Sequence, residues 1–287
     1  MPEGDTLFRT ARTLHRALAG KPVTGFRSTY PLLTRFHDDT PLTGQLVRLV
    51  ESRGKWLLIH FSGGATLATH MLMSGSWHIY RPGERWQKPV SHMRIILENA
   101  DLLAIGFHVP VARMHTAQSL ARELRIPNVT LDLLSPDFDV QAACACITLN
   151  AEREIADVLL DQHVLAGVGN EFKSEICFVC AVNPFARVAS LSAEQIAALV
   201  AACQRLLRAN VLEDSGDTLV TYRGLHRRTT HESDPGESVW VYGRAEQPCR
   251  RCGACIERRL QGPDARVTFW CPLCQPIPDG SDVDESD

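Results

Sequence analysis

Two cysteine pairs, Cys249-Arg250-Arg251-Cys252 and Cys271-Pro272-Leu273-Cys274, decide how the last part of the chain folds. Eighteen residues separate the two pairs. Each pair can supply two thiolates from one turn of backbone, and four thiolates at this separation are typical of a tetrahedral zinc site. We therefore expect one structural Zn2+ ion bound by Cys249, Cys252, Cys271 and Cys274. The alternative is a set of four buried or disulfide-bonded cysteines.

The segment around these cysteines is short and basic. A structural zinc site contributes on the order of 10–16 kcal/mol of metal-coupled folding, which is enough to order a segment with little core of its own. Arginines make this segment a candidate surface for phosphate groups, although a solvated charged face is an equal alternative. They are Arg244, Arg250, Arg251, Arg258, Arg259 and Arg266.

Length and composition limit the class of protein. The chain has 287 residues, of which 45% are hydrophobic, so we expect one large or two medium domains besides the zinc segment. The sequence has no run of eighteen apolar residues, so we expect no membrane span. The N-terminus lacks the pattern of a signal peptide. Ten cysteines without such a signal favour a reducing, cytoplasmic location.

The net charge of the chain is -3, but its charged residues are unevenly distributed along the sequence. The last nine residues carry five acidic side chains, and without those five charges the net charge is +2. We expect residues 277–287 to form a disordered acidic tail. The remaining chain is therefore compatible with a nucleic-acid partner.

Hydrophobic periodicity divides the rest of the chain. Leu7, Ala11, Leu14 and Leu18 mark one face of a helix that Asp5 can cap. Short apolar runs separated by turn residues follow, and they predict an antiparallel β-sandwich. The expected fold class is α+β multidomain. The expected parts are a β-sandwich domain with a flanking helix at 1–126, a linker at 127–136, a helical domain ending in a polar loop at 137–238, and a zinc finger at 239–276.

The stretch Ala166-Gly167-Val168-Gly169-Asn170 opens a predicted helix with two glycines. Such a loop lets the backbone approach an anion closely, with the first N–H groups of the helix pointing outward. A tight turn between two helices also uses glycine, so this alternative stays open. A third cysteine pair, Cys177 and Cys180, lies within the same predicted helix, where we expect it to be core packing.

The other end of the chain, Met1-Pro2-Glu3, carries candidate chemistry. Removal of Met1 would expose the secondary amine of Pro2. An α-amino group titrates near about 7.7–8, against about 10.4 for lysine, so it is a much better nucleophile at neutral pH. Glu3 could donate and accept the proton. The alternative is that Pro2 is an ordinary N-terminal residue.

Four separate segments together resemble the formamidopyrimidine-DNA glycosylase/endonuclease VIII family. They are Met1–Asp5, Ser52–Lys55, Asp161–Asn170 and Tyr242–Gln275. The resemblance covers nearly the whole chain up to Gln275. It is closer to the endonuclease VIII branch, and within that branch to the second type found in actinobacteria.

The resemblance implies the roles of three catalytic residues. Pro2 matches the nucleophile that attacks C1′ of the damaged nucleotide. Glu3 matches the acid that protonates the deoxyribose ring oxygen. Lys55 matches a lysine in a turn between two strands, which contacts a phosphate and supports catalysis.

The same resemblance implies four DNA contacts. Asn170 matches a phosphate-binding asparagine of the helix–two-turns–helix motif, and Arg266 matches a zinc-finger arginine beside the lesion. His70 falls where the family places another phosphate contact. Met73 falls where the family places a side chain that fills the gap left by the flipped nucleotide, a task that suits an unbranched apolar residue. Ordinary core packing of Met73 is the alternative.

The implied function is that of a bifunctional DNA glycosylase/AP lyase acting on damaged DNA as a monomer. Base excision followed by β,δ-elimination would leave a one-nucleotide gap. Residues 105–111 lack the Arg-Arg-Phe-Gly motif of the purine-repair branch, and residues 214–238 lack its lesion-capping pattern, which favours oxidised pyrimidines. The alternatives are an oxidised-purine glycosylase and a non-catalytic protein that binds damaged DNA.

Overall fold

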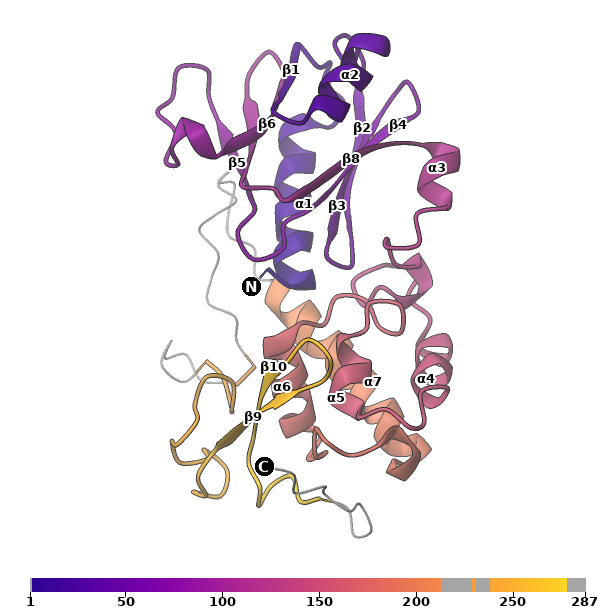
Figure 1. Ribbon diagram of the computed structural model, residues 1–287, viewed down its shortest axis with the longest axis vertical. Coiled ribbons are helices and arrows are strands. Elements are labelled where there is room, and N and C mark those ends of the chain that lie inside the picture. The colour runs from indigo at the N-terminus through magenta and orange to yellow at the C-terminus, as the bar shows by residue number, and fades with distance from the viewer. Residues whose placement is uncertain (1, 213–228, 231–237, 278–287) are drawn as a thin grey trace. The chain divides into compact units, whose positions relative to one another are not determined.

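The computed structural model describes residues 2–212, 229–230 and 238–277 (Figure 1). The predicted acidic tail from residue 278 onward and most of the predicted polar loop lie outside the described residues. The chain divides into two compact units, and the division in the N-terminal half falls between Pro127 and Asn128. Among the described residues, no helix is both long and apolar enough to cross a membrane.

The N-terminal unit contains two four-stranded antiparallel sheets and a long helix, α1 (Gly4–Leu18). In Figure 1, α1 runs alongside the strands. One sheet has the strand order β1 (Gly25–Ser28), β6 (Met93–Glu98), β7 (Leu103–Phe107) and β5 (Ser76–Tyr80). The other has the order β2 (Val47–Arg53), β3 (Trp56–Phe61), β4 (Ala65–His70) and β8 (Val111–Thr116). This architecture confirms the predicted β-sandwich with a flanking helix.

Helix α1 and both sheets share one hydrophobic core. The four predicted residues of the helical face, Leu7, Ala11, Leu14 and Leu18, are each at most 3% exposed. Strand β3 is apolar on both sides: Leu57 and Ile59 belong to the core with α1, whereas Trp56 and Leu58 pack with Ile126 on the opposite side. Two short helices, α2 (Pro31–Asp39) and α3 (Ala117–Ala121), and a 3-10 turn at Val90–His92 complete the unit.

The predicted cap of α1 is wrong. Glu3, not Asp5, is the N-cap residue, with extended backbone at φ -115° and ψ -175°. Asp5 lies inside the first turn, is fully buried and pairs with Arg9 at 3.5 Å. The helix therefore begins two residues earlier than the sequence pattern indicated, directly after Pro2 and Glu3.

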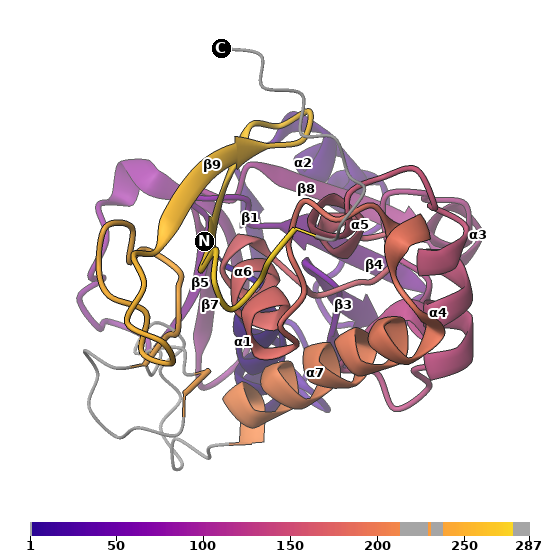
Figure 2. The same cartoon turned by 90° about the horizontal axis from the view of Figure 1, so that it is seen from below.

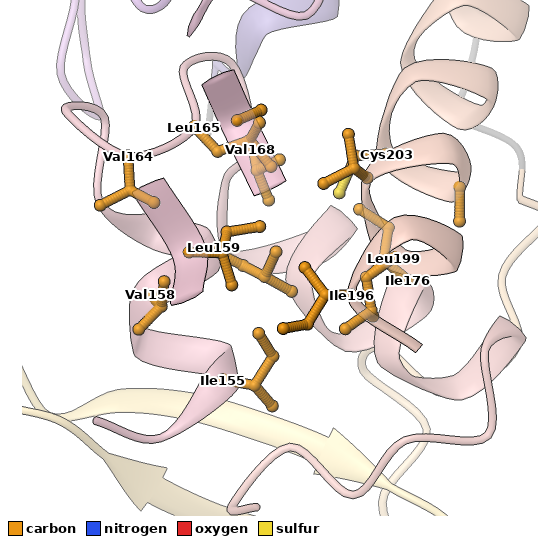
Figure 3. Close-up of a cluster of buried hydrophobic side chains, with 14 of the residues drawn as sticks. Ile155, Val158, Leu159, Val164, Leu165, Val168, Ile176, Ile196, Leu199 and Cys203 are labelled. Atoms are coloured by element: carbon orange, nitrogen blue, oxygen red, sulfur yellow. The ribbon is translucent and has the colours of Figure 1, made fainter. Parts of the chain in front are cut away.

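The second unit is built around four helices: α4 (Val140–Thr148), α5 (Ile155–Leu160), α6 (Asn170–Val179) and α7 (Ala193–Leu212). Figure 2 shows α7 running past α6 and α4. Apolar side chains from α5, the following turn, α6 and α7 converge in its core (Figure 3). Ser192 and Gln195 form a capping box at the start of α7: Oε1 of Gln195 accepts from the N–H of Ser192 at 2.8 Å, and Oγ of Ser192 accepts from the N–H of Gln195 at 3.2 Å. Short 3-10 turns occur at Val129–Leu131 and Val188–Ser190.

The C-terminal part of this unit is a hairpin of β9 (Glu257–Gln261) and β10 (Arg266–Trp270) flanked by the cysteine pairs. The run Val239-Trp240-Val241-Tyr242-Gly243-Arg244 predicts a strand before the cysteine pairs, but the structure forms no strand there. The backbone N–H groups of Trp240, Val241 and Tyr242 bond instead to the carboxylate of Glu175, each at 2.8 Å. A buried side chain thus replaces the neighbouring strand that the prediction assumed.

Candidate active site and nucleic-acid interface

The two candidate catalytic residues of the N-terminus, Pro2 and Glu3, lie directly before helix α1. Pro2 is half-buried, and Glu3 is 1% exposed. The carbonyl of Glu3 accepts the first backbone bond of the helix from the N–H of Leu7, at 3.1 Å. The helix therefore fixes the backbone of Glu3, and Pro2 directly precedes this N-cap residue.

Lys55 and His70 lie close together at one end of the second sheet. Gly54 and Lys55 form the tight turn between β2 and β3, in which Arg53 pairs with Trp56. Gly54 has a φ of 56°, a conformation that favours glycine. Trp56 in turn pairs with His70 across β3 and β4, and their rings meet edge to face with centroids 5.1 Å apart.

The protonation of His70 follows from this position. Burial lowers the pKa of His70, and the nearby positive charge of Lys55 lowers it further. Nδ1 of His70 accepts a hydrogen bond from the N–H of Leu72 at 3.2 Å. The imidazole is therefore neutral at pH 7 and carries its proton on Nε2, which makes Nε2 a hydrogen-bond donor.

Met73 is exposed and not part of the core. The turn after β4 is closed by a bond of 2.8 Å from the N–H of Gly75 to the carbonyl of Met71. Met71 is buried beneath it, whereas Leu72 is 48% and Met73 is 68% exposed. The core-packing alternative for Met73 is therefore excluded. Leu72, which sequence reasoning missed, stands beside Met73 with a φ of 45°.

Asn170 and Arg266 are joined through one residue of the hairpin. Asn170 is the first residue of α6, after Gly169 as N-cap. Its Nδ2 donates to the carbonyl of Val267 at 2.9 Å, while its Oδ1 is buried without a hydrogen-bond partner among the described residues. Arg266 is half-exposed and approaches Asp264 at 3.7 Å. Both predicted phosphate contacts of this unit therefore lie at the same edge of the hairpin.

The four predicted cysteines converge on one point. The Sγ atoms of Cys249, Cys252, Cys271 and Cys274 all lie within 4.8 Å of one another, an arrangement that can hold a metal ion. Sγ of Cys252 lies 3.4 Å from Sγ of Cys271, and Sγ of Cys249 lies 3.9 Å from Sγ of Cys274. Cys255 is exposed and does not belong to this group. Cys177, in contrast, is buried in the helical core as predicted, and burial raises the pKa of its thiol to about 12.

Two buried charged residues of α6 were missed by sequence reasoning. Glu175 is fully buried and accepts, besides its three backbone bonds, a bond from the hydroxyl of Thr229. Lys173 is also fully buried, and its Nζ donates to Oγ1 of Thr268 at 2.6 Å. The available signal was a pair of charges on a helix whose neighbours Phe172 and Ile176 are apolar.

The predicted site residues therefore form two groups, each inside one unit. Pro2, Glu3, Lys55, His70 and Met73 belong to the N-terminal unit, and Asn170, Arg266 and the four cysteines belong to the second. A β-sandwich, a glycine-opened helix and a four-cysteine hairpin in this order define a class of DNA-repair proteins built on the helix–two-turns–helix motif.

Comparison with known families agrees with this class. Residues 1–108 match the formamidopyrimidine-DNA glycosylase N-terminal domain, and residues 129–221 match the formamidopyrimidine-DNA glycosylase H2TH domain. The chain therefore belongs to the formamidopyrimidine-DNA glycosylase family, as the sequence motifs indicated.

Its curated relatives include proteins of the endonuclease VIII branch. The chain is 39% identical to the probable endonuclease 8 2 of Streptomyces coelicolor, over 97% of this chain and 95% of the relative. It is 38% identical to the DNA-(apurinic or apyrimidinic site) lyase Nei2 of Mycolicibacterium smegmatis, over 96% and 99%. It is 32% identical to endonuclease 8 of Escherichia coli, over 96% and 100%.

Solved structures share the fold. The Lactococcus lactis Fpg in complex with DNA containing an abasic site superposes with a TM-score of 0.77 and 21% identity, over 96% of this chain and 99% of the other. MutM in complex with DNA containing carbocyclic 8-oxo-G gives the same TM-score at 22% identity, over 96% and 100%. At this identity the likeness concerns the fold alone.

Proposed function

We propose that this protein is a bifunctional DNA glycosylase and AP lyase of base excision repair, with oxidised pyrimidines as its preferred bases. The observation that carries the proposal is the N-terminal Pro2-Glu3 pair, in which Glu3 is buried at the first turn of α1. A protein that only binds damaged DNA has no use for this pair. The family and the endonuclease 8 relatives support the same activity.

The proposed chemistry uses the two residues in different roles. After removal of Met1, the lone pair of the Pro2 amine attacks C1′ of the flipped nucleotide. The base leaves with the electrons of the glycosidic bond and takes up a proton. The Pro2 nitrogen then loses its own proton, and its electron pair forms an iminium with C1′ as the C1′–O4′ bond breaks and Glu3 donates a proton to O4′. The resulting iminium withdraws electrons, so that loss of a C2′ proton expels the 3′ phosphate and a second elimination expels the 5′ phosphate.

The proposed DNA contacts act from both units. Lys55 and the Nε2–H of neutral His70 bind phosphate from the end of the β-sandwich. Asn170 and Arg266 bind phosphate from the helical unit, where the N-terminus of α6 adds favourable N–H groups. Exposed Met73 fills the space in the base stack, which offsets part of the few kcal/mol that flipping costs.

The metal proposed for the cysteine group is Zn2+. A tetrahedral ion with zinc–sulfur bonds of about 2.3 Å has sulfur–sulfur distances of about 3.8 Å, which is close to the 3.4 and 3.9 Å observed. When bound, the ion supplies structural cross-linking, because four protein thiolates leave no coordination position for water. The cysteines would thus hold the hairpin and Arg266 in place.

The sequence division into residues 1–126, 127–136, 137–238, 239–276 and 277–287 is part of this proposal. So are a monomeric state and a cytoplasmic location close to DNA. The family resemblance and the ten cysteines of the chain support these proposals.

A lesion panel tests the function. Matched duplexes would carry 5,6-dihydrouracil, thymine glycol, 8-oxoguanine or an abasic site, and base release and strand cleavage would be measured separately. We expect release of the oxidised pyrimidines and a one-nucleotide gap. Faster release of 8-oxoguanine would favour the oxidised-purine glycosylase, and binding without cleavage would favour the non-catalytic alternative.

A further inference from the structure

The buried ammonium group of Lys173 lies under the hairpin of the cysteine segment. Lys173 has no exposed surface, although lysine is almost never fully buried unless its charge is compensated. Its Nζ donates to Oγ1 of Thr268 at 2.6 Å and approaches the carbonyl of Val267 at 3.5 Å. Both acceptors belong to β10. The buried ammonium group of Lys173 thus bonds helix α6 to the hairpin.

A chain of buried polar groups continues from Lys173 through the hairpin. Oγ1 of Thr268 donates to Oε1 of Gln261 at 2.6 Å. Nε2 of Gln261 donates in turn to Oε2 of Glu154 at 2.6 Å and to the carbonyl of Pro184 at 3.0 Å. Gln261 is 5% exposed and Thr268 is 0% exposed. The chain therefore fixes both strands of the hairpin against the helical unit.

The turn of the hairpin is also fixed to α5. Gly262 approaches Asp157 so closely that an added Cβ would lie 2.3 Å from Oδ1. Burial raises the pKa of Asp157, and the charge of Lys173 opposes this shift, which shows that the two groups are near each other. A cavity of about 140 Å3 at this place is lined by Asp157, Gly262 and Arg266, among others.

Lys173 is placed to act on both phosphate contacts of the unit. Asn170 and Lys173 are one helical turn apart, so they share a face of α6. Both bond to the carbonyl of Val267, the residue that follows Arg266. Arg266 and Thr268 are two residues apart on one strand and so point to the same side. The bond that holds Thr268 therefore also sets the direction of Arg266.

We propose that Lys173 is a positioning residue that holds Asn170 and Arg266 as one rigid phosphate-binding pair. Its ammonium group does not contact DNA, because it is fully buried; it acts through Thr268 and Val267. The inference rests on the proposed DNA-binding function of this site. The buried charge of Lys173 and the cysteine group would then both hold the hairpin, and Lys173 would couple it to α6.

The first test compares Lys173→Met, Thr268→Val and Thr268→Ser in binding to duplex DNA containing a tetrahydrofuran abasic analogue. Lys173→Met removes the ammonium group, and Thr268→Val removes only its acceptor. Both are expected to weaken binding about tenfold, the equivalent of one charge-assisted hydrogen bond. On duplex DNA with a natural, cleavable abasic site, both are expected to raise KM more than they lower kcat. Thr268→Ser keeps the hydroxyl and is expected to retain most of the affinity. Equal affinity of Thr268→Val and wild type would overturn the proposal.

The second test asks whether Lys173 acts through Arg266. Each phosphate contact contributes about 0.9 to the slope of log K against log salt concentration. Arg266→Gln should lower that slope by about this amount, and Lys173→Met should lower it similarly although Lys173 is buried. In the Arg266→Gln background, Lys173→Met should have little further effect. Additive losses with an unchanged slope would identify a purely structural role and contradict the proposal.

As a control for folding, the metal content and the midpoint of thermal unfolding are measured for each variant. If wild-type protein fails to bind the abasic-analogue DNA, the proposed function itself fails. If wild type binds and cleaves while both Lys173→Met and Thr268→Val match it, only the inference on Lys173 fails.

Discussion

Lys55 lowers the pKa of His70, because the turn that carries Lys55 and the strand end that carries His70 meet through Trp56. Burial is the larger cause of the shift, and the charge of Lys55 is the smaller. A cation and a neutral hydrogen-bond donor thus lie side by side on the surface proposed to bind phosphate. Two neighbouring imidazolium and ammonium charges would repel each other in the free protein.

Replacing Lys55 by glutamine should raise the pKa of His70, although burial should still keep it below about 6.5. Because the folded pKa is lowered, the contribution of His70 to the free energy of unfolding is complete above about pH 6.5 and is lost as the pH falls toward the folded pKa. The pH titration of the His70 ring protons by NMR measures both states. An unchanged pKa in Lys55→Gln would contradict the electrostatic contact.

Glu175 should be essential for the stability of the segment before the cysteine pairs. Its carboxylate accepts three backbone N–H groups, and hydrogen bonds to a buried charge contribute about 1.5–3 kcal/mol each. Glu175→Gln replaces one carboxylate oxygen by a donor, so at least one N–H group loses its acceptor. We expect the free energy of unfolding to fall by about 2 kcal/mol or more in denaturant titrations. Glu257→Gln, at an exposed position of β9, is the matched control and should unfold like the wild type.

The metal group should support DNA binding and not the chemistry. Cys271→Ser removes one of the four thiolates, and we expect loss of the ion together with weaker binding to abasic-analogue DNA. Cys255→Ser removes an exposed thiol outside the group and should keep one ion per chain and full affinity. Metal analysis and binding isotherms on the same samples measure both properties. Full affinity in a metal-free Cys271→Ser protein would refute the structural role of the ion.

Met73 should matter for duplex DNA and not for folding. Because its side chain is 68% exposed, Met73→Ala should change the free energy of unfolding by less than about 0.5 kcal/mol. Its loss should slow base release from duplex DNA, where a gap in the stack must be filled, more than from single-stranded DNA. Leu149→Ala, at a residue 84% exposed in the helical unit, serves as the control. Equal activity of Met73→Ala and wild type on both substrates would exclude the role of a wedge.

Local patterns predicted much of the fold. The strands Trp56–Phe61, Ser76–Tyr80 and Met93–Glu98 coincide with apolar runs in the sequence, because apolar runs between turn residues are a local signal. Strand β1 and helix α2 were missed, since a four-residue strand and a nine-residue helix beginning at Pro31 give only weak periodicity. The prediction of a strand at residues 239–244 was wrong for a different reason. The backbone N–H groups of this segment bond to the side chain of Glu175, which is distant in sequence.

The site residues divide in a similar way. The cysteine group followed from spacing alone, because a metal geometry fixes the separation of its ligands. The resemblance to a family supplied Lys55, Asn170 and Arg266, whose roles stay predictions. The apolar neighbours of Lys173 and Glu175 hinted that both are buried. Their bonding partners could not be predicted, since these lie far away in sequence and only the folded structure brings them together.

We expect the amine of Pro2 to attack the sugar and form a covalent protein–DNA intermediate that borohydride can trap. Wild-type protein would be incubated with abasic-site DNA and borohydride, and the adduct would be located by mass spectrometry after proteolysis. We predict a reduced cross-link on the N-terminal peptide at Pro2, with Met1 removed, and a much weaker cross-link in Pro2→Gly, which retains a primary amine. A cross-link on any other residue, or none with the wild type, would contradict the account.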